Sequence, residues 1–137
     1  MTRVLVCGGR DFADRALVFA ALNRVHVALR FEVLIHGDCR DRDGKPCGAD
    51  ALAGEWARSR RVPEVRFPVS KQEWRTLGKK AGPMRNARML REGRPDVVIA
   101  FPGERGTADM MKQAKRAGVP VHEVREDGAI EPEIRKE

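Results

Sequence analysis

A glycine-containing turn follows an apolar run in the C-terminal third of the chain. Residues 97–101 are apolar, and the turn after them reads Pro102, Gly103, Glu104, Arg105, Gly106, Thr107. An apolar run bounded by turn residues is typical of a strand buried on both faces, and Thr107 stands where a helix N-cap is expected. Free N–H groups and the helix dipole favour an anion at such a turn. We therefore predict a phosphate site that uses four of these residues: Pro102, Gly103, Gly106 and Thr107.

Two further glycine turns carry side chains suited to a nucleotide. The first holds Gly8, Gly9, Arg10 and Asp11. Arg10 could clamp a phosphate through two hydrogen bonds, and Asp11 could accept a bond from a ribose hydroxyl or simply cap the turn or the following helix. The second turn begins at Gly37 and Asp38, follows His36 and continues to Gly48 and Asp50. Asp38 leaves the same alternatives open, we expect Asp50 to cap the next helix, and His36 is the one histidine to test as an acid or base.

A third group of polar residues comes from two helix starts. Arg85 and Asn86 begin a helix in a basic segment, where they could hold an anionic group and orient it. Asp109 lies in the first turn of the last predicted helix, where the dipole alone would stabilise a carboxylate. It could also act as a general base or stabilise a developing ribosyl cation. Arg85 and Asp109 are thus candidates for catalysis, although the residues do not define a catalytic set.

Alternating strands and helices must position these side chains. Apolar patterns and turn residues predict strands at 3–7, 32–36, 64–67, 96–101 and 120–124, with helices at 14–30, from 50, at 83–92 and at 107–117. This order indicates a single Rossmann-like, three-layer α/β domain over residues 1–124, with a mainly parallel sheet of about five strands. The polar tail, residues 125–137, is expected to pack little. Loops after parallel strands leave one edge of a sheet, so the three glycine turns should meet in one cleft.

Composition limits the class of protein and its partners. The chain has 137 residues, a net charge of +7, no apolar run long enough to cross a bilayer and no charged-then-apolar leader. We expect a cytoplasmic protein without membrane contact. Residues 71–94 carry eight basic and two acidic side chains, a field that favours nucleotides or nucleic acid, or forms a solvated helix face. The spacing of Cys39 and Cys47 matches no usual zinc motif, so no metal and no cofactor are predicted.

Four ordered motifs resemble those of a known family. They are residues 6–12 (VCGGRDF), 36–38 with 48–50 (HGD and GAD), 81–86 (AGPMRN) and 99–110 (IAFPGERGTADM). Together they are similar to the YspA-like, cpYpsA-related SLOG family of the SMF/DprA–LOG superfamily, over about residues 3–124. The resemblance implies a Rossmann-like fold and a protein that binds a nucleotide or a nucleotide-derived ligand, such as AMP, ADP-ribose or an NAD-like molecule, as a sensor.

Two relatives within that superfamily imply alternative functions. LOG phosphoribohydrolases use an upstream arginine, which Arg85 matches, and a PGGxGTxxE loop. Here Glu104 replaces the second glycine of that loop, and Met110 stands where the catalytic glutamate belongs. The alternative of a nucleoside monophosphate phosphoribohydrolase, an N-glycosidase, therefore lacks its carboxylate. The second alternative is a DprA-like accessory protein that binds nucleic acid weakly. Residues 40–47 form a longer loop than the family usually has, either a lid or a surface insertion, and the relatives imply a homodimer.

Overall fold

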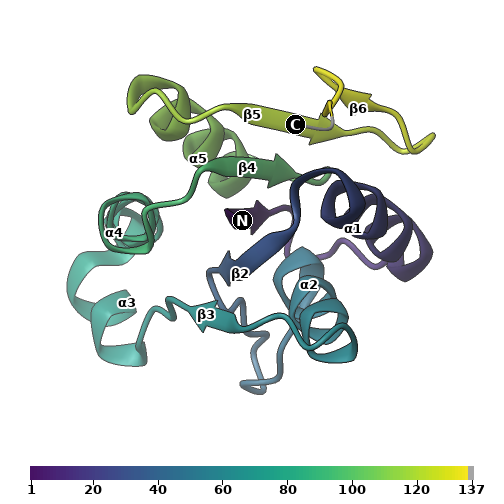
Figure 1. Ribbon diagram of the computed structural model, residues 1–137. Coiled ribbons are helices and arrows are strands. Elements are labelled where there is room, and N and C mark those ends of the chain that lie inside the picture. The colour runs from purple at the N-terminus through teal and green to yellow at the C-terminus, as the bar shows by residue number, and fades with distance from the viewer. Residues whose placement is uncertain (136–137) are drawn as a thin grey trace.

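A six-stranded sheet forms the centre of the computed structural model, which describes residues 1–135. Its order is β3-β2-β1-β4-β5-β6 (Figure 1). The first five strands run parallel, and β6 pairs antiparallel with β5. The predicted α/β class with a mainly parallel sheet is confirmed, with one short strand more than expected. The strands are β1 (Thr2–Cys7), β2 (Phe31–His36), β3 (Glu64–Arg66), β4 (Val97–Ala100), β5 (Val121–Val124) and β6 (Ile130–Glu131).

The central strands are apolar on both sides because helices cover both faces of the sheet. Along β1, Val4 and Val6 belong to one buried cluster, whereas Leu5 and Cys7 belong to the other. The neighbouring β4 alternates in the same way between the two clusters. This period of two is what a strand between two layers requires, and it explains why these strands read as continuous apolar runs.

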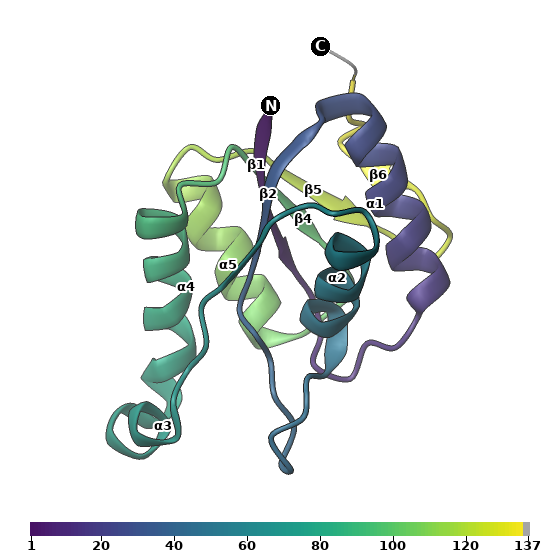
Figure 2. The same ribbon diagram turned by 60° about the horizontal axis from the view of Figure 1, so that its bottom comes forward.

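Helices lie in two layers, one on each face of the sheet (Figures 1 and 2). On one face lie α1 (Arg15–Leu29) and α2 (Gly48–Ser59), and on the other α4 (Ala81–Gly93) and α5 (Arg105–Arg116). Pro83 lies in the first turn of α4, where its missing N–H costs nothing. None of the helices within residues 1–135 has the length and apolar character needed to cross a membrane.

The last helix begins earlier than the sequence suggested. Its N-cap is Glu104, whose side chain makes no capping hydrogen bond, and Thr107 lies inside the first turn. The prediction of Thr107 as the N-cap is therefore wrong by three positions. The reason is visible in packing: Thr107 is buried, with its side chain turned toward the Gly103 backbone.

The segment between β3 and α4 forms a short exposed helix. It comprises α3 (Lys71–Leu77) followed by a single 3₁₀ turn, η1 (Gly78–Lys80). A capping box starts α3, since Ser70 accepts a bond from the Glu73 N–H while Glu73 accepts one from the Ser70 N–H. No residue of α3 is buried. Local capping, rather than core packing, therefore defines this helix.

The C-terminal segment packs more than predicted. Ile130 in β6 is buried, and Ile134 packs against the same core cluster. Gly128 accepts a hydrogen bond from the Arg24 side chain in α1, at 3.0 Å. The expectation that the tail packs little is therefore wrong for the described part of it. Two isoleucines suffice to anchor an otherwise polar segment, and residues 136 and 137 lie outside the described residues.

Candidate functional site

A cavity of about 640 Å³ opens at the carboxyl ends of the central strands. It lies where the strand order reverses between β1 and β4, the position at which open parallel sheets bind ligands. Its volume falls within the range usual for small-molecule sites. All the residues predicted from sequence as ligand-binding line this one cavity, namely Gly8, Gly9, Arg10, Asp11, Gly37, Asp38, Arg85, Asn86, Pro102, Gly103, Gly106 and Thr107.

Backbone hydrogen bonds join the three loops around the cavity. The Gly9 N–H donates to the Pro102 carbonyl at 2.8 Å, which links the β1 loop to the β4 loop. The Gly9 carbonyl in turn accepts a bond from the Ala49 N–H at 3.1 Å, which links the same loop to the start of α2. Gly48 has a φ of +69°, and a Cβ there would lie 2.4 Å from the Gly9 oxygen. The three loops are thus packed together as one unit. The contact between Gly48 and Gly9 leaves no room for a side chain at residue 48, so only glycine fits there.

The turn between β4 and α5 uses its two glycines differently. A Cβ on Gly103 would lie 2.1 Å from the Thr107 Oγ1 and 2.7 Å from the Gly9 nitrogen. A Cβ on Gly106 would meet nothing within 4 Å. Gly103 is therefore needed for loop packing, whereas Gly106 leaves open space at the first turn of α5, where helical N–H groups have no partner within the helix.

Arg85 is held against the cavity wall by three oxygen atoms. Its Nη1 donates to the carbonyls of Gly37 at 2.5 Å and Phe67 at 3.3 Å, and its Nε donates to the Asn86 Oδ1 at 3.2 Å. None of these acceptors is a carboxylate. The guanidinium therefore keeps its full charge available to an anion in the cavity.

Asn86 connects α4 to the start of α5. Its buried Nδ2 donates to the Gly106 carbonyl at 3.2 Å and to the Asp109 Oδ2 at 3.0 Å. The same Asp109 oxygen accepts a bond from Gln113 at 2.7 Å. Asp109 is not among the residues that line the cavity. The amide of Asn86 is thus occupied by the protein, and its role here is to position the glycine turn.

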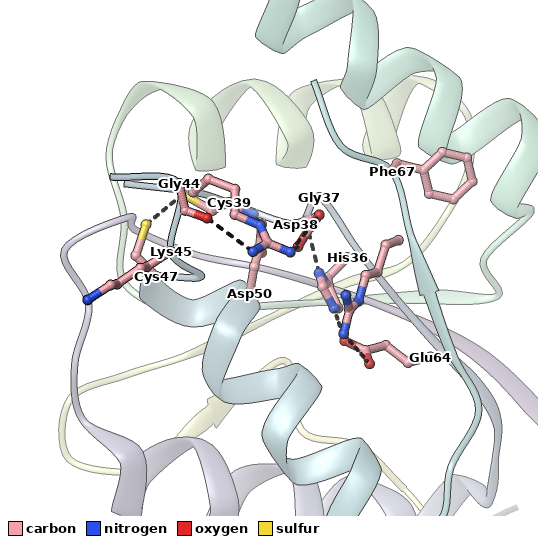
Figure 3. A network of polar contacts seen from close by, with 12 residues as sticks. His36, Gly37, Asp38, Cys39, Gly44, Lys45, Cys47, Asp50, Glu64 and Phe67 are labelled. Carbon is pink, nitrogen blue, oxygen red and sulfur yellow. Dashed lines mark hydrogen bonds and ion pairs between the residues drawn. The ribbon is translucent and has the colours of Figure 1, made fainter. Parts of the chain in front are cut away.

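The position at which the resemblance placed a catalytic glutamate is apolar. Met110 is buried and lines the cavity together with Met89. The buried carboxyl group in the lining is instead Asp50, which was expected to cap α2. That expectation is wrong, because Cys47 occupies the N-cap and Asp50 accepts a bond from the Cys39 N–H at 3.1 Å (Figure 3). Burial raises the pKa of the Asp50 carboxyl, and nearby His36 and Arg85 offset only part of this effect.

Arg10 contacts the loop that follows β2. Its Nη2 donates to the Arg40 carbonyl at 2.9 Å and lies 4.0 Å from the Cys39 sulfur. Asp11 is exposed at the rim and does not cap α1, because the Asp14 side chain accepts the Leu17 N–H. Asp11 therefore does not cap the following helix, and the Asp11 carboxylate is exposed in the cavity lining.

The loop after β2 folds as a small hairpin that projects from the sheet edge (Figure 2). Arg40 and Pro46 form an antiparallel bridge, and the Asp41 N–H donates to the Lys45 carbonyl at 2.8 Å. Asp38 enters the hairpin with a φ of +49° and pairs with Arg40 at 3.0 Å. Arg40 lines the cavity, so the insertion contributes to the site rather than lying apart from it.

His36, at the end of β2, binds the first residues of this loop and does not line the cavity. Its Nδ1 accepts the Asp38 N–H at 2.9 Å, and its Nε2 lies 2.5 Å from Glu64 on β3 (Figure 3). Burial of Glu64 opposes its ionisation, but hydrogen bonds from Arg66, His36 and Arg58 outweigh this and lower the pKa of Glu64 to about 2. The ring of His36 is thus committed to structure at both nitrogens, which argues against the acid–base role considered from sequence.

Sequence reasoning missed two aromatic residues of the lining, Phe12 and Trp74. Trp74 on α3 is 47% exposed and lines the cavity beside Val69 and Gly82. The other tryptophan, Trp56 on α2, is fully buried. A tryptophan in a short, mainly polar stretch of the basic segment 71–94 was the available signal for Trp74.

The comparisons with known proteins agree with this architecture. A family model described as the YspA, cpYpsA-related SLOG family matches residues 2–74. The Gene 61 protein of Mycobacterium phage D29 is 39% identical over 126 residues, which cover 88% of this chain and 94% of the phage protein. No solved structure matches. Family membership points to a nucleotide-related ligand without naming it. The chain belongs to the YspA, cpYpsA-related SLOG family.

Proposed function

We propose that this cavity binds a nucleotide or nucleotide-derived ligand of the AMP, ADP-ribose or NAD class, and that the protein acts as a sensor of it. One observation carries the proposal: loops from β1, β2 and β4 and the first turn of α5 surround a single cavity at the switch point of the sheet. That arrangement brings backbone N–H groups and a helix dipole to one anion site. Family membership supports the same class of ligand.

The phosphate would lie at the turn of residues 103–107. Gly106 leaves open space at the first turn of α5, and the Asn86 side chain holds that turn by donating to the Gly106 carbonyl. Arg10 and Arg85 line the same cavity and carry no carboxylate partner within hydrogen-bonding distance among the described residues. Two guanidinium groups beside a helix N-terminus favour a dianionic phosphate over a neutral ligand.

The base would stack on Trp74. This exposed aromatic ring lines the cavity from α3, a helix that buries none of its own side chains. Stacking of a base on an aromatic side chain contributes about 1–3 kcal/mol. Because Trp56 is fully buried and does not line the cavity, a ligand-dependent change in tryptophan fluorescence would report on Trp74.

Binding is a better match to these residues than hydrolysis of an N-glycosidic bond. Met110 supplies no carboxylate, and Asp109 is engaged by Asn86 and Gln113 outside the cavity lining. Hydrolysis would require a positioned acid or base within reach of the ligand, and the buried carboxyl of the lining, Asp50, is already bound by the Cys39 N–H. We therefore propose sensing rather than turnover for this site.

A ligand panel tests the proposal. Calorimetry and thermal shift with AMP, ADP-ribose, NAD and 3′,5′-cyclic AMP should identify at least one binder. At 100 times its dissociation constant that binder adds about 2.7 kcal/mol to the free energy of unfolding. Arg85→Ala should weaken binding, whereas Arg91→Ala, on an exposed part of α4, should not.

Three further readings of the same samples separate the alternatives. Free base released from a nucleotide would establish a glycosidase. Affinity for a single-stranded oligonucleotide that falls steeply with salt would establish nucleic-acid binding instead. If no nucleotide shifts the melting temperature, the assignment of the cavity is wrong. Light scattering on these samples tests the homodimer expected from the relatives.

A further inference from the structure

Two cysteines face each other at the base of the hairpin beside the cavity. The Sγ atoms of Cys39 and Cys47 are 3.3 Å apart, and the Cys47 N–H donates to the Cys39 carbonyl at 3.0 Å (Figure 3). The S–S bond of a disulfide is about 2.05 Å long. The two sulfurs therefore lie close to bonding distance, on two arms of the hairpin that a backbone hydrogen bond already joins.

Both cysteines are fixed by the protein rather than carried at the tip of a loop. The Cys39 N–H donates to the buried carboxyl of Asp50, and Cys47 is the N-cap residue of α2. Between them, the bridge of Arg40 with Pro46 holds the two arms of the hairpin together. Joining the sulfurs would require a movement of the side chains and little change in the backbone.

The pair is also accessible, unlike the third cysteine. Cys39 and Cys47 are each partly exposed, whereas Cys7 is buried in β1. Cys39 lines the cavity and lies 4.0 Å from the guanidinium of Arg10. A small thiol reagent can therefore reach the pair from solvent, and Cys7 serves as an internal control.

We propose that Cys39 and Cys47 form a redox-active dithiol, which closes to an intrachain disulfide by exchange with a low-molecular-weight disulfide. The thiolate of one cysteine attacks the reagent disulfide, forms a mixed disulfide and releases one reagent thiol. The second cysteine then attacks the protein sulfur of that mixed disulfide and releases the other reagent thiol. Two protein thiols are oxidised, one reagent disulfide is reduced, and both protons end on the released thiols.

Thiolates rather than thiols attack disulfides. Either cysteine can make the first attack, and the partner sulfur, 3.3 Å away, then resolves the mixed disulfide. Burial raises the pKa of the Cys39 thiol, whereas the neighbouring Arg10 acts in the opposite direction.

The disulfide would act on the wall of the cavity. Arg10 donates to the carbonyl of Arg40, the residue next to Cys39, and both arginines line the cavity. Closing the base of the hairpin would fix this contact, whereas reduction would leave it to the hairpin hydrogen bonds alone. This chemistry does not depend on the identity of the ligand, so it stands or falls separately from the proposed function.

A redox titration of the full chain tests the proposal. The protein is equilibrated in buffers of reduced and oxidised glutathione, quenched in acid, unfolded and alkylated, and its intact mass is measured. We expect two of the three thiols to become unreactive together over a single transition, with no glutathione retained at its end. Three alkylated thiols in the most oxidising buffer, a retained glutathione adduct or a disulfide between two chains would each overturn the proposal.

Three variants and a protease locate the bond. Cys39→Ser and Cys47→Ser should each abolish the two-thiol transition and retain a glutathione adduct on the remaining cysteine of the pair, whereas Cys7→Ala should leave the transition unchanged. Trypsin can cut after the exposed Arg40 or Arg42, between the two cysteines. The nicked oxidised chain should migrate as one species until it is reduced. Separation of the halves without reductant would contradict the assignment.

Discussion

The two helical layers of this protein differ in what they bury. The layer of α1 and α2 contains the larger core cluster, including an aromatic group in which Trp56 contacts Phe31 and His26 edge-on, with ring centroids 5.2 and 5.6 Å apart. The opposite layer has a smaller cluster, and its first helix, α3, buries no residue. Both layers border the cavity and both expose large hydrophobic residues, Val27 in the first and Trp74 and Met84 in the second, but of these three only Trp74 lines the cavity.

This difference indicates a division of work between the layers. The first layer supplies most of the apolar burial, which is the main stabilising contribution in a domain of this size. The second layer supplies Trp74, Arg85 and Asn86, which contact or shape the cavity. Elements that bind ligands commonly come from the less stable parts of a protein. Substitutions on the two sides should therefore separate loss of stability from loss of binding.

The two tryptophans give the largest expected contrast. Trp56→Ala removes a fully buried ring and leaves the Asn23 Oδ1 without its 2.9 Å bond from the indole, so it should cost about 3–5 kcal/mol of stability. Trp74→Ala removes a half-exposed ring and should change stability by less than about 0.5 kcal/mol. Urea unfolding measures both. Comparable losses in the two variants would show that α3 is part of the core and that the contrast between the layers is wrong.

Glu64 on β3 contacts His36 on β2 and Arg58 on α2. These polar contacts should make the stability of the first layer sensitive to acid. The pKa of Glu64 is about 2 in the folded chain, below its ordinary value of 4.5. As pH falls below about 4.5 the unfolded chain takes up this proton first, so the stabilisation is lost progressively down to about pH 2. Because the Arg58 and Arg66 partners are exposed and screened by solvent, the corresponding stabilisation is about 1–2 kcal/mol.

The matching variant is Glu64→Gln, compared with the wild type by urea unfolding at pH 7, 4 and 3. The stability difference between the two proteins should shrink as pH falls, because glutamine does not titrate. Glu55→Gln, which removes an exposed ion pair with Arg15, is the control and should change stability by at most about 1 kcal/mol. A constant difference between wild type and Glu64→Gln across this range would show that ionised Glu64 does not stabilise the folded chain.

Much of the fold could be predicted because periodicity reports burial. The runs that became β1 and β4 are apolar on both faces, and that pattern alone indicated a parallel sheet between two layers. The site followed from topology, since glycine turns after parallel strands meet at one edge. What could not be predicted were features set by contacts distant in sequence. Asp50 was expected to cap its own helix, yet its partner is the Cys39 N–H across the hairpin.

The same limit explains the wrong predictions for Thr107 and for the segment after residue 124. Thr107 resembles an N-cap by type, but packing against Gly103 draws it inside α5. The segment after residue 124 is polar on average, but Ile130 and Ile134 find an apolar cluster formed mainly by residues far earlier in the chain. Local composition cannot reveal such a partner. Trp74 was overlooked for the converse reason, because its significance lies in the cavity it lines and not in its neighbours along the chain.

The two glycines of the β4 turn give the sharpest division between packing and binding. Gly103→Ala places a methyl group 2.7 Å from the Gly9 backbone and should cost about 1–3 kcal/mol. Gly106→Ala meets nothing within 4 Å and, since alanine favours helix, should leave stability unchanged or raise it by up to about 1 kcal/mol. It should nevertheless weaken AMP binding about tenfold or more, or about 1.4 kcal/mol, because the methyl group occupies the space proposed for the phosphate.

Chemical unfolding and calorimetry on this pair measure the two quantities independently. The phosphate assignment requires that Gly106→Ala lose affinity while it keeps its stability, a combination that a folding defect cannot produce. If Gly106→Ala instead binds AMP as the wild type does, the open space at the start of α5 is not the anion site. The ligand would then have to lie nearer Arg85 and Trp74, against α4 and α3 rather than at the start of α5.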